Sequence, residues 1–273
     1  MDYKMVVCDC DNTLIDSRGY LPPENIKAIR KVMEKGVKFV IASGRNDLLV
    51  LDYANEIGGD ITLIGCNGAT IRNINKGITY RNEIIPKEGL KKIFDCLDKY
   101  NLDFKAYTIE KSYVRGFDLG NQIKNLTGNY YENVKDFPMI PVEKTSEIIN
   151  EGILKVVRID KKEELFKIQN ELKDVENINA VFSSQICLDM ISDKASKGSA
   201  MLELAEKTGI KPSEIVAFGD SQNDLSMLEN AGLSVCMENG TEEVKKRCKM
   251  VTATNNEAGV ARALDKIFEL GIY

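Results

Sequence analysis

Residues 5–14 read Met-Val-Val-Cys-Asp-Cys-Asp-Asn-Thr-Leu, an apolar run that ends in two aspartates. Apolar runs of this kind are typical of strands that are buried on both faces of a parallel sheet. Because side chains alternate along a strand, we expect Asp9 and Asp11 to point the same way and Cys10 to point the other way. Two neighbouring carboxylates repel each other, so we expect a cation such as Mg²⁺, or a bound proton, beside them.

The same form, an apolar strand that stops at small or charged residues, recurs along the chain. Residues 38–45 and residues 215–220 have it, and Lys197 stands at the entry to a predicted helix. In open α/β sheets, ligands bind outside the carboxyl ends of the strands. The sequence therefore predicts one site at that edge, built from residues that are far apart in the chain.

The chain of 273 residues carries a net charge of −5 and contains no histidine. Its size and composition are those of a folded protein with one large or two modest domains. The acidic balance argues against a nucleic-acid partner. The sequence shows no signal peptide and no membrane span, so we expect a cytoplasmic protein without a membrane partner. We expect the seven scattered cysteines to be reduced thiols.

The absence of histidine also limits the chemistry. It removes the usual general base and the Ser-His-Asp triad, so acid and base roles fall to carboxylates, lysine, tyrosine or cysteine. Without histidine, and without a Cys-x-x-Cys motif, a zinc site is not expected.

The pattern of elements divides the chain into two parts. In residues 1–83 and 188–273, predicted strands alternate with predicted helices, which indicates an α/β core with a Rossmann-like, doubly wound parallel sheet. In residues 84–187, strands pair with neighbouring strands, and the predicted elements include a helix near 117–126. We interpret residues 84–187 as an α+β domain inserted into the core.

Each candidate motif has a structural alternative. Asp9 and Asp11 could form a polar turn with Asn12 instead of a catalytic pair. Ser43 and Gly44 could bring backbone N–H groups to an anion, or they could form a glycine turn and a helix N-cap.

Two later motifs also have both a functional and a structural interpretation. Lys197 opens a helix, where the helix dipole opposes a cation unless the lysine faces an anion; otherwise it points into water. Asp220, Asn223 and Asp224 follow a strand without charges, and the two carboxylates could converge on a cation or cap a helix.

Taken together, these motifs resemble those of the haloacid dehalogenase superfamily of phosphohydrolases, in its Cof-like branch with a large α/β cap. In chain order they are Asp9-x-Asp11-x-Thr13-Leu14, Ser43-Gly44-Arg45, Lys197-Gly198 and Gly219-Asp220-x-x-Asn223-Asp224. They stand in the family's order, and the insertion of residues 84–187 falls where that branch places its cap. Asn12 departs from the family's usual glycine. Because asparagine tolerates left-handed backbone conformations, we expect the turn to persist.

The resemblance implies a Mg²⁺-dependent phosphatase that acts on a small phosphorylated metabolite, such as a sugar phosphate. Asp9 would attack phosphorus and form an aspartyl-phosphate, and Asp11 would protonate the leaving oxygen and then activate water. Mg²⁺ would be held by Asp9, the backbone carbonyl of Asp11 and Asp220, with Asp224 further from the ion. The residues implied around the phosphate are Thr13, Ser43, Gly44, Arg45, Asn67, Lys197 and Asn223.

Two other functions remain open at this point: a phosphomutase on the same scaffold, and a non-catalytic protein that binds a phosphorylated ligand. The inserted domain is expected to select the substrate. Its predicted hairpin strands carry Lys105, Tyr107, Tyr113 and Arg115, which could contact a sugar or could face water.

Overall fold

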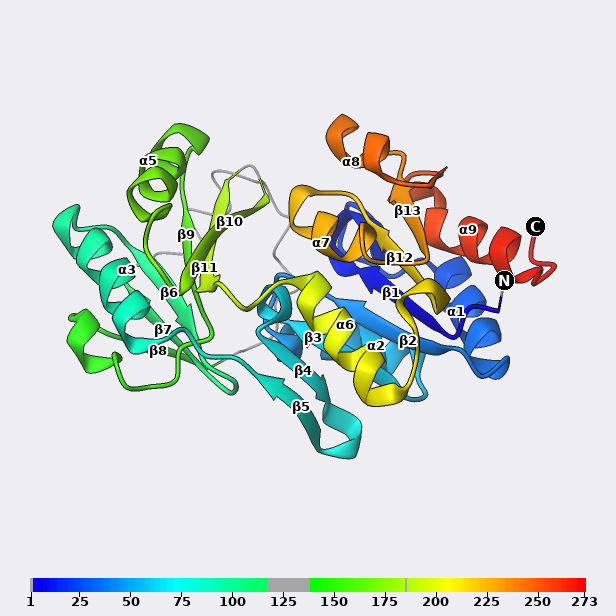
Figure 1. Ribbon diagram of the computed structural model, residues 1–273, viewed down its shortest axis with the longest axis horizontal. Coiled ribbons are helices and arrows are strands. Elements are labelled where there is room, and N and C mark those ends of the chain that lie inside the picture. The colour runs from blue at the N-terminus through cyan, green and yellow to red at the C-terminus, as the bar shows by residue number, and fades with distance from the viewer. Residues whose placement is uncertain (1, 117–137, 185) are drawn as a thin grey trace. The chain divides into compact units, whose positions relative to one another are not determined.

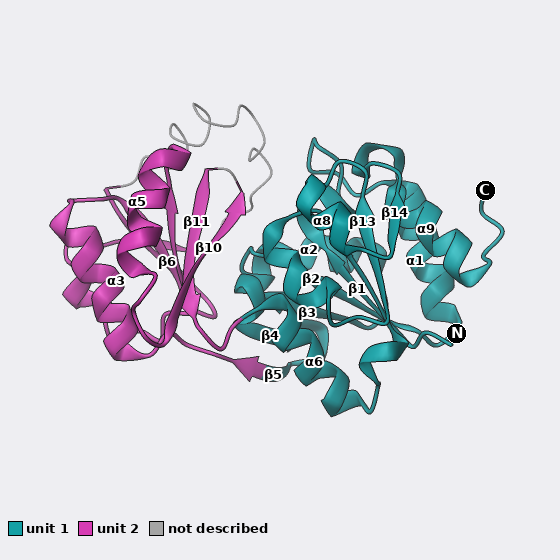
Figure 2. Ribbon diagram, turned by 45° about the horizontal axis from the view of Figure 1, so that its top comes forward, with its two compact units in different colours: residues 1–80, 196–273 teal, residues 81–195 magenta. Residues whose placement is uncertain are grey.

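The computed structural model describes residues 2–116, 138–184 and 186–273. The chain divides into two compact units, with residues 1–80 and 196–273 in unit 1 and residues 81–195 in unit 2 (Figure 2). The helix predicted near residues 117–126 lies outside the described residues. No helix in the described part is both long enough and apolar enough to cross a membrane.

Unit 1 is built on an eight-stranded sheet (Figure 1). In spatial order its strands are β14 (Met250–Thr252), β13 (Leu233–Met237), β12 (Ile215–Gly219), β1 (Met5–Asp9), β2 (Lys38–Ala42), β3 (Ile61–Gly65), β4 (Thr70–Asn73) and β5 (Ile78–Asn82). Neighbouring strands from β14 to β3 pair in parallel, and β4 returns antiparallel to β3. The prediction of a mostly parallel, Rossmann-like sheet is confirmed.

Apolar side chains on both faces of this sheet explain the continuous apolar strands. Along β1, Val6 and Cys8 join one buried cluster, whereas Met5 and Val7 join another on the opposite face. The helices that cover the Val6 face are α1 (Pro23–Glu34), α2 (Leu51–Ile57) and α9 (Gly259–Phe268). The helices that cover the Met5 face are α6 (Lys197–Thr208), α7 (Leu225–Leu228) and α8 (Glu242–Arg247).

The limits of α1 follow from local chemistry. Pro23 is its first residue, where a missing N–H costs nothing and a fixed φ suits the helix. Ala28, Ile29 and Val32 recur at helical spacing and are fully buried. Gly36, just beyond the helix, has a φ of +84°, a conformation that glycine adopts without strain. These residues explain where α1 begins, which side it buries and where it ends.

In the part of the chain that the structure describes, unit 2 has a six-stranded sheet with two α-helices on one of its faces (Figure 2). In spatial order its strands are β10 (Ile178–Ser184), β11 (Cys187–Ser192), β9 (Lys155–Ile159), β6 (Phe104–Tyr107), β7 (Ser112–Arg115) and β8 (Met139–Pro141). The helices are α3 (Lys87–Lys99) and α5 (Lys162–Leu172), and their apolar sides pack with Phe104, Val156 and Leu188 of the sheet.

The second boundary of this unit differs from the sequence-based one. The sequence placed the end of the insertion at residue 187, but β11 begins there and pairs with both β9 and β10. Unit 2 therefore runs to Ala195, directly before α6. The sequence pattern identified the strand itself, and its pairing with β9 and β10 assigns it to unit 2.

Candidate active site

The carboxyl end of β1 positions Asp9. Met5 and Val7 pack on the side of α6, and strand alternation directs the Asp9 side chain to the same side. Asp9 is buried there, with 4% of its surface exposed. β1 ends at Asp9, and Cys10–Leu14 forms a tight turn. The alternation that orients Asp9 therefore does not reach Asp11, whose position is set by the turn.

The turn after β1 depends on Asn12. Its φ of +59° lies in the left-handed region, and the expectation that asparagine supports this turn is confirmed. The next residue, Thr13, is fully buried, and its Oγ1 donates a hydrogen bond to Asp220 Oδ1 at 3.2 Å. The turn after β1 is thereby tied to the loop after β12.

Three carboxylates meet beside the end of β1. One oxygen from each of Asp9, Asp220 and Asp224 lies within 4.8 Å of the others, and all three residues are buried. β1 and β12 are parallel neighbours, with Cys8 opposite Phe218, so the residues that follow them emerge at the same edge of the sheet. Of the four carboxylates predicted to lie near a cation, the structure brings together those of Asp9, Asp220 and Asp224.

Lys197, the first residue of α6, lies among these carboxylates. Its ammonium donates to Asp9 Oδ1 at 2.5 Å and to Asp224 Oδ1 at 2.6 Å, and only 1% of the residue is exposed. Ser196 caps the helix by accepting a hydrogen bond from the backbone N–H of Ser199. The lysine therefore faces anions, which removes the conflict with the helix dipole.

Close backbone packing fixes the start of α6. A Cβ atom on Gly68 would lie 2.1 Å from the carbonyl oxygen of Ser196, and one on Gly198 would lie 2.2 Å from that of Ser226. The backbone N–H of Gly198 also donates to Ser226 Oγ at 3.0 Å. A larger side chain at either glycine would displace the helix start, and Lys197 with it.

Asp224 holds the loop after β12 as well as Lys197. Its Oδ2 accepts hydrogen bonds from the backbone N–H groups of Asp220 at 3.0 Å and Ser221 at 3.1 Å. Gly219 makes room for this arrangement, since a Cβ there would lie 2.6 Å from the Asp224 Cβ. Both Asp224 oxygens are thus engaged within the protein. Among the described residues, by contrast, the Asp220 carboxylate accepts a hydrogen bond from Thr13 alone.

Because Asp224 is fully hydrogen-bonded within the protein and Asp220 is not, we expect their alanine substitutions to affect the free energy of unfolding differently. In EDTA, Asp224→Ala should lower the free energy of unfolding by about 3 kcal/mol or more, because buried N–H groups and the Lys197 ammonium lose a partner. Asp220→Ala should leave stability unchanged or raise it, since it removes a repelling carboxylate. Urea unfolding of both variants measures the difference, with Asp52→Ala, an exposed residue of α2, as the control. A larger loss in Asp220→Ala would contradict this assignment.

The electrostatics of the cluster favour a bound cation. Burial and the Asp224 carboxylate raise the pKa of Asp9 to about 7, and burial and Asp9 raise the pKa of Asp220 well above its usual value. Burial lowers the pKa of Lys197, but Asp224 and Asp9 outweigh it and raise that pKa above its usual value. Three ionised carboxylates and one ammonium carry two net negative charges. Their hard oxygen donors fit Mg²⁺ or a similar divalent ion.

Asp11 lies outside this cluster among the described residues and pairs with Arg45 instead. Arg45 Nε donates to Asp11 Oδ2 at 3.0 Å and Nη2 donates to Oδ1 at 2.5 Å, a two-pronged carboxylate contact. Burial opposes the charge of Arg45, but the Asp11 carboxylate raises the pKa of the guanidinium well above its usual value. The side chains of Asp9 and Asp11 therefore have different partners.

The remaining predicted residues form a chain of hydrogen bonds from β2 to β12. Ser43 follows β2; its Oγ accepts the Arg45 N–H at 3.0 Å, and its carbonyl oxygen accepts the Asn67 N–H at 3.0 Å. Asn223 Nδ2 donates to Asn67 Oδ1 at 3.0 Å. Gly44 lies in the loop between Ser43 and Arg45. The structure thus connects Ser43, Asn67 and Asn223.

The prediction from the sequence did not include Asn239, which supports the site. Asn239, in the loop after β13, donates from Nδ2 to the backbone oxygen of Asn12 at 2.8 Å. Two residues further on, the backbone N–H of Thr241 donates to the backbone oxygen of Asp220. Residues 233–240 read as an apolar strand followed by Glu-Asn-Gly, the same form as the other motifs, so the signal was present in the sequence.

In unit 2, the structure separates the four hairpin residues that sequence reading grouped together. Tyr113 and Arg115 lie on the helix side of the sheet, where each bonds to a carboxylate of the same unit. Lys105 and Tyr107 lie on the opposite face, because side chains alternate along β6.

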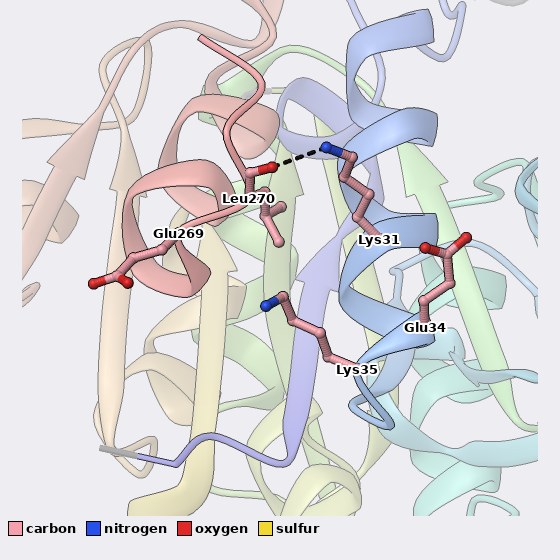
Figure 3. A pocket seen from close by; sticks show the side chains of 5 residues that line it. All are labelled: Lys31, Glu34, Lys35, Glu269 and Leu270. Carbon is pink, nitrogen blue, oxygen red and sulfur yellow. Dashed lines mark hydrogen bonds between the residues drawn. The ribbon is translucent and has the colours of Figure 1, made fainter.

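A surface hollow of unit 1 is lined by residues outside the carboxylate cluster. It has a volume of about 270 Å³ and lies between α1 and the residues after α9 (Figure 3). Lys31 Nζ donates to the carbonyl oxygen of Leu270 at 2.8 Å across it. None of the predicted site residues lines this hollow. We do not assign it a function.

Comparisons with known proteins extend over nearly the whole chain. A family model described as haloacid dehalogenase-like hydrolase matches residues 6–264. A Haemophilus influenzae relative is 31% identical over 98% of this chain and 99% of its own. A 5-amino-6-(5-phospho-D-ribitylamino)uracil phosphatase from Bacillus subtilis is 28% identical over 97% of this chain and 98% of its own. A solved haloacid dehalogenase-like hydrolase from B. subtilis matches with a TM-score of 0.86 at 27% identity, over 96% of this chain and 99% of that one.

Proposed function

The chain belongs to the haloacid dehalogenase-like hydrolase family and is a phosphatase, and from this premise we propose its substrate class and the roles of its site residues. It hydrolyses a small phosphorylated metabolite, such as a sugar phosphate, with Mg²⁺ and through an aspartyl-phosphate. The observation that carries this proposal is the buried group of Asp9, Asp220 and Asp224 with the Lys197 ammonium among them.

Asp9 is the nucleophile. A carboxylate oxygen of Asp9 forms a bond to phosphorus while the ester oxygen leaves with its electron pair. Burial and the Asp224 carboxylate raise the pKa of Asp9 to about 7, even with Lys197 beside it. The Lys197 ammonium, 2.5 Å from Asp9 Oδ1, favours the ionised form.

Asp11 carries the proton. It donates a proton to the leaving oxygen and later accepts one from the water that attacks the aspartyl-phosphate. In the structure, the Arg45 guanidinium contacts both carboxylate oxygens of Asp11.

Three groups would hold Mg²⁺: the carboxylates of Asp9 and Asp220 and the backbone carbonyl of Asp11. Bound there, the ion would neutralise charge on the phosphoryl group and on the carboxylates. Asp224 positions these groups, because one of its oxygens binds Lys197 and the other binds the loop N–H groups.

The phosphoryl oxygens bind to groups that surround the same strand ends. Ser43, Lys197 and Asn223 supply hydroxyl, ammonium and amide donors, supported by Thr13 and by the backbone at Gly44. Such fixed donors supply most of the stabilisation in phosphoryl transfer, because the charge is spread over the oxygens. Unit 2 selects the leaving group, since these donors can recognise only the phosphate.

Metal removal tests the proposal. The purified protein should hydrolyse p-nitrophenyl phosphate and sugar phosphates only with Mg²⁺ or a similar hard cation, because the three clustered carboxylates repel without one. Initial rates are measured after EDTA treatment and again after Mg²⁺ is restored. Calcium, which prefers more ligands and longer bonds, is the control ion. Full activity of the stripped protein in excess EDTA would contradict the proposed metal dependence.

A further inference from the structure

Asp47 is a fully buried carboxylate that none of the sequence motifs includes. It lies in the loop after β2, two residues beyond Arg45. Its Oδ1 accepts a hydrogen bond from Arg72 Nη1 of β4 at 3.2 Å, and only 16% of the Arg72 side chain is exposed. Asp47 and Arg72 therefore form an ion pair that is largely shielded from water.

A glycine of β3 leaves the space for this carboxylate. A Cβ atom on Gly65 would lie 2.7 Å from the backbone nitrogen of Asp47 and 2.9 Å from the Asp47 Cβ. Gly65 pairs with Thr70 of β4, and Arg72 follows two residues later on the same strand. The ion pair thus holds the loop after β2 against the end of β3 and the start of β4.

The backbone directly after β3 is strained where it meets this loop. Cys66 has a φ of +49°, a left-handed conformation that is unfavourable for a residue other than glycine or asparagine. Its N–H donates to the carbonyl oxygen of Arg45 at 2.7 Å. Strained residues persist only where surrounding contacts fix them. The pair of Asp47 and Arg72 supplies such a contact beside the strained turn.

Stability alone does not account for a buried ion pair at this position. Burial raises the pKa of Asp47, and the Arg72 charge offsets this only in part. Apolar side chains of similar volume are often as stable as a buried ion pair, or more so. An ion pair, unlike an apolar contact, requires its partners to meet in one direction, so it can fix the position of a loop.

The residue that depends most on a fixed loop is Arg45. The Ser43 N–H donates to the carbonyl oxygen of Ile64 at 2.8 Å, so the start of the loop is already joined to β3. Arg45 lies between that point and Asp47, and its guanidinium contacts both carboxylate oxygens of Asp11. A two-pronged contact of this kind has a strict geometry, so it tolerates little displacement of the arginine backbone.

We propose that Asp47 and Arg72 are positioning residues for Arg45: their ion pair fixes the loop after β2, and with it the guanidinium that meets Asp11. Both act through Arg45 rather than on the substrate. The inference rests on the proposed function, because it assumes that the contact between Arg45 and Asp11 serves catalysis. It adds two residues outside the predicted motifs to those that determine the rate.

Substitutions at both ends of the ion pair test the inference. Asp47→Asn and Arg72→Gln each remove one charge and keep a polar side chain. Each should lower kcat for p-nitrophenyl phosphate about tenfold, because Asp11 activates water in the second half of the reaction. Asp60→Asn is the matched control, since Asp60 forms an ion pair with Lys76 at 2.5 Å that includes no predicted site residue. It should leave kcat unchanged.

The Arg45→Met background separates positioning from a general structural role. If the pair acts through Arg45, Asp47→Asn should change kcat less than twofold once the guanidinium is gone. A tenfold loss in both backgrounds would mean that the pair supports the loop without positioning Arg45, and would overturn the inference. Urea unfolding identifies the folded variants, and Arg72→Gln gives the same comparison if Asp47→Asn does not fold.

Nuclear magnetic resonance of the Arg45 side chain separates this inference from the proposed function. In EDTA and without substrate, the Nε–H signal that Arg45→Met removes identifies this group in the wild-type protein. Asp47→Asn and Arg72→Gln should speed its exchange with water about tenfold, because Nε loses its fixed contact with Asp11 Oδ2. Asp60→Asn should not.

Faster exchange in the two variants would support the positioning role even if the protein hydrolysed no ester, a result that would contradict only the proposed function. Unchanged exchange in both folded variants would overturn the inference, and hydrolysis of p-nitrophenyl phosphate would then remain as separate support for the proposed function.

Discussion

Asp9→Asn is expected to lower the turnover of phosphate esters by about 10⁴-fold or more, because the amide cannot act as the nucleophile. The fold should persist. Asp9 lies among like charges, and Lys197 keeps its second bond, to Asp224 Oδ1 at 2.6 Å. Steady-state rates in Mg²⁺, together with urea unfolding, measure the two effects separately.

Two controls make the Asp9→Asn result specific. Asp52→Asn makes the same chemical change at an exposed position of α2 and should leave the rate unchanged. Acid quenching of the wild-type enzyme during turnover should trap a phosphate-bearing peptide that contains residue 9, and the variant should trap none. A folded Asp9→Asn protein with nearly wild-type turnover would refute the covalent mechanism.

Asp11→Asn should lower turnover by roughly 10²–10⁴-fold, the usual contribution of a general acid or base. The loss should depend on the leaving group. An alkyl phosphate needs a proton on its departing oxygen, whereas p-nitrophenolate leaves without one, so formation of the aspartyl-phosphate from p-nitrophenyl phosphate should be affected least. Arg45 retains an oxygen acceptor in the asparagine, so the fold should persist.

Rapid-quench measurement of the two half-reactions is the decisive readout for Asp11→Asn. With p-nitrophenyl phosphate, release of the phenolate should stay fast while hydrolysis of the aspartyl-phosphate slows, because water activation still requires the carboxylate. Asp52→Asn again serves as the control. Equal losses in phenolate release for the aryl and alkyl esters would mean that Asp11 does not donate the proton.

The sequence was most informative where a local rule decides the geometry. Alternation along β1 places Asp9 on the same side as Met5 and Val7, and that side carries α6 and Lys197. The tolerance of asparagine for positive φ correctly predicted that the turn at Asn12 would persist. Parallel pairing then brings the ends of β1 and β12 to one edge. These features follow from short stretches of the chain.

The rest required contacts between distant residues. The pairing of Asp11 with Arg45 depends on the direction that the turn after β1 gives the Asp11 side chain. The alternation of side chains along a strand does not predict this direction, because β1 ends at Asp9. The division of the unit 2 hairpin depends on register: Tyr113 lies opposite Ala106 and faces the helices, whereas Lys105 faces away from them. Residue types alone cannot show which face of a sheet a hairpin side chain occupies.

The packing at the start of α6 has a mechanical consequence. Lys197 stands two residues after the last residue of unit 2, so the chain that leaves that unit leads almost directly to the group that bonds Asp9. The contacts of Gly68 with Ser196 and of Gly198 with Ser226 clamp the backbone on both sides of Lys197. Ser196, Gly68, Gly198 and Ser226 all belong to unit 1. The backbone position of Lys197, the residue that bonds Asp9, is therefore set by packing inside unit 1.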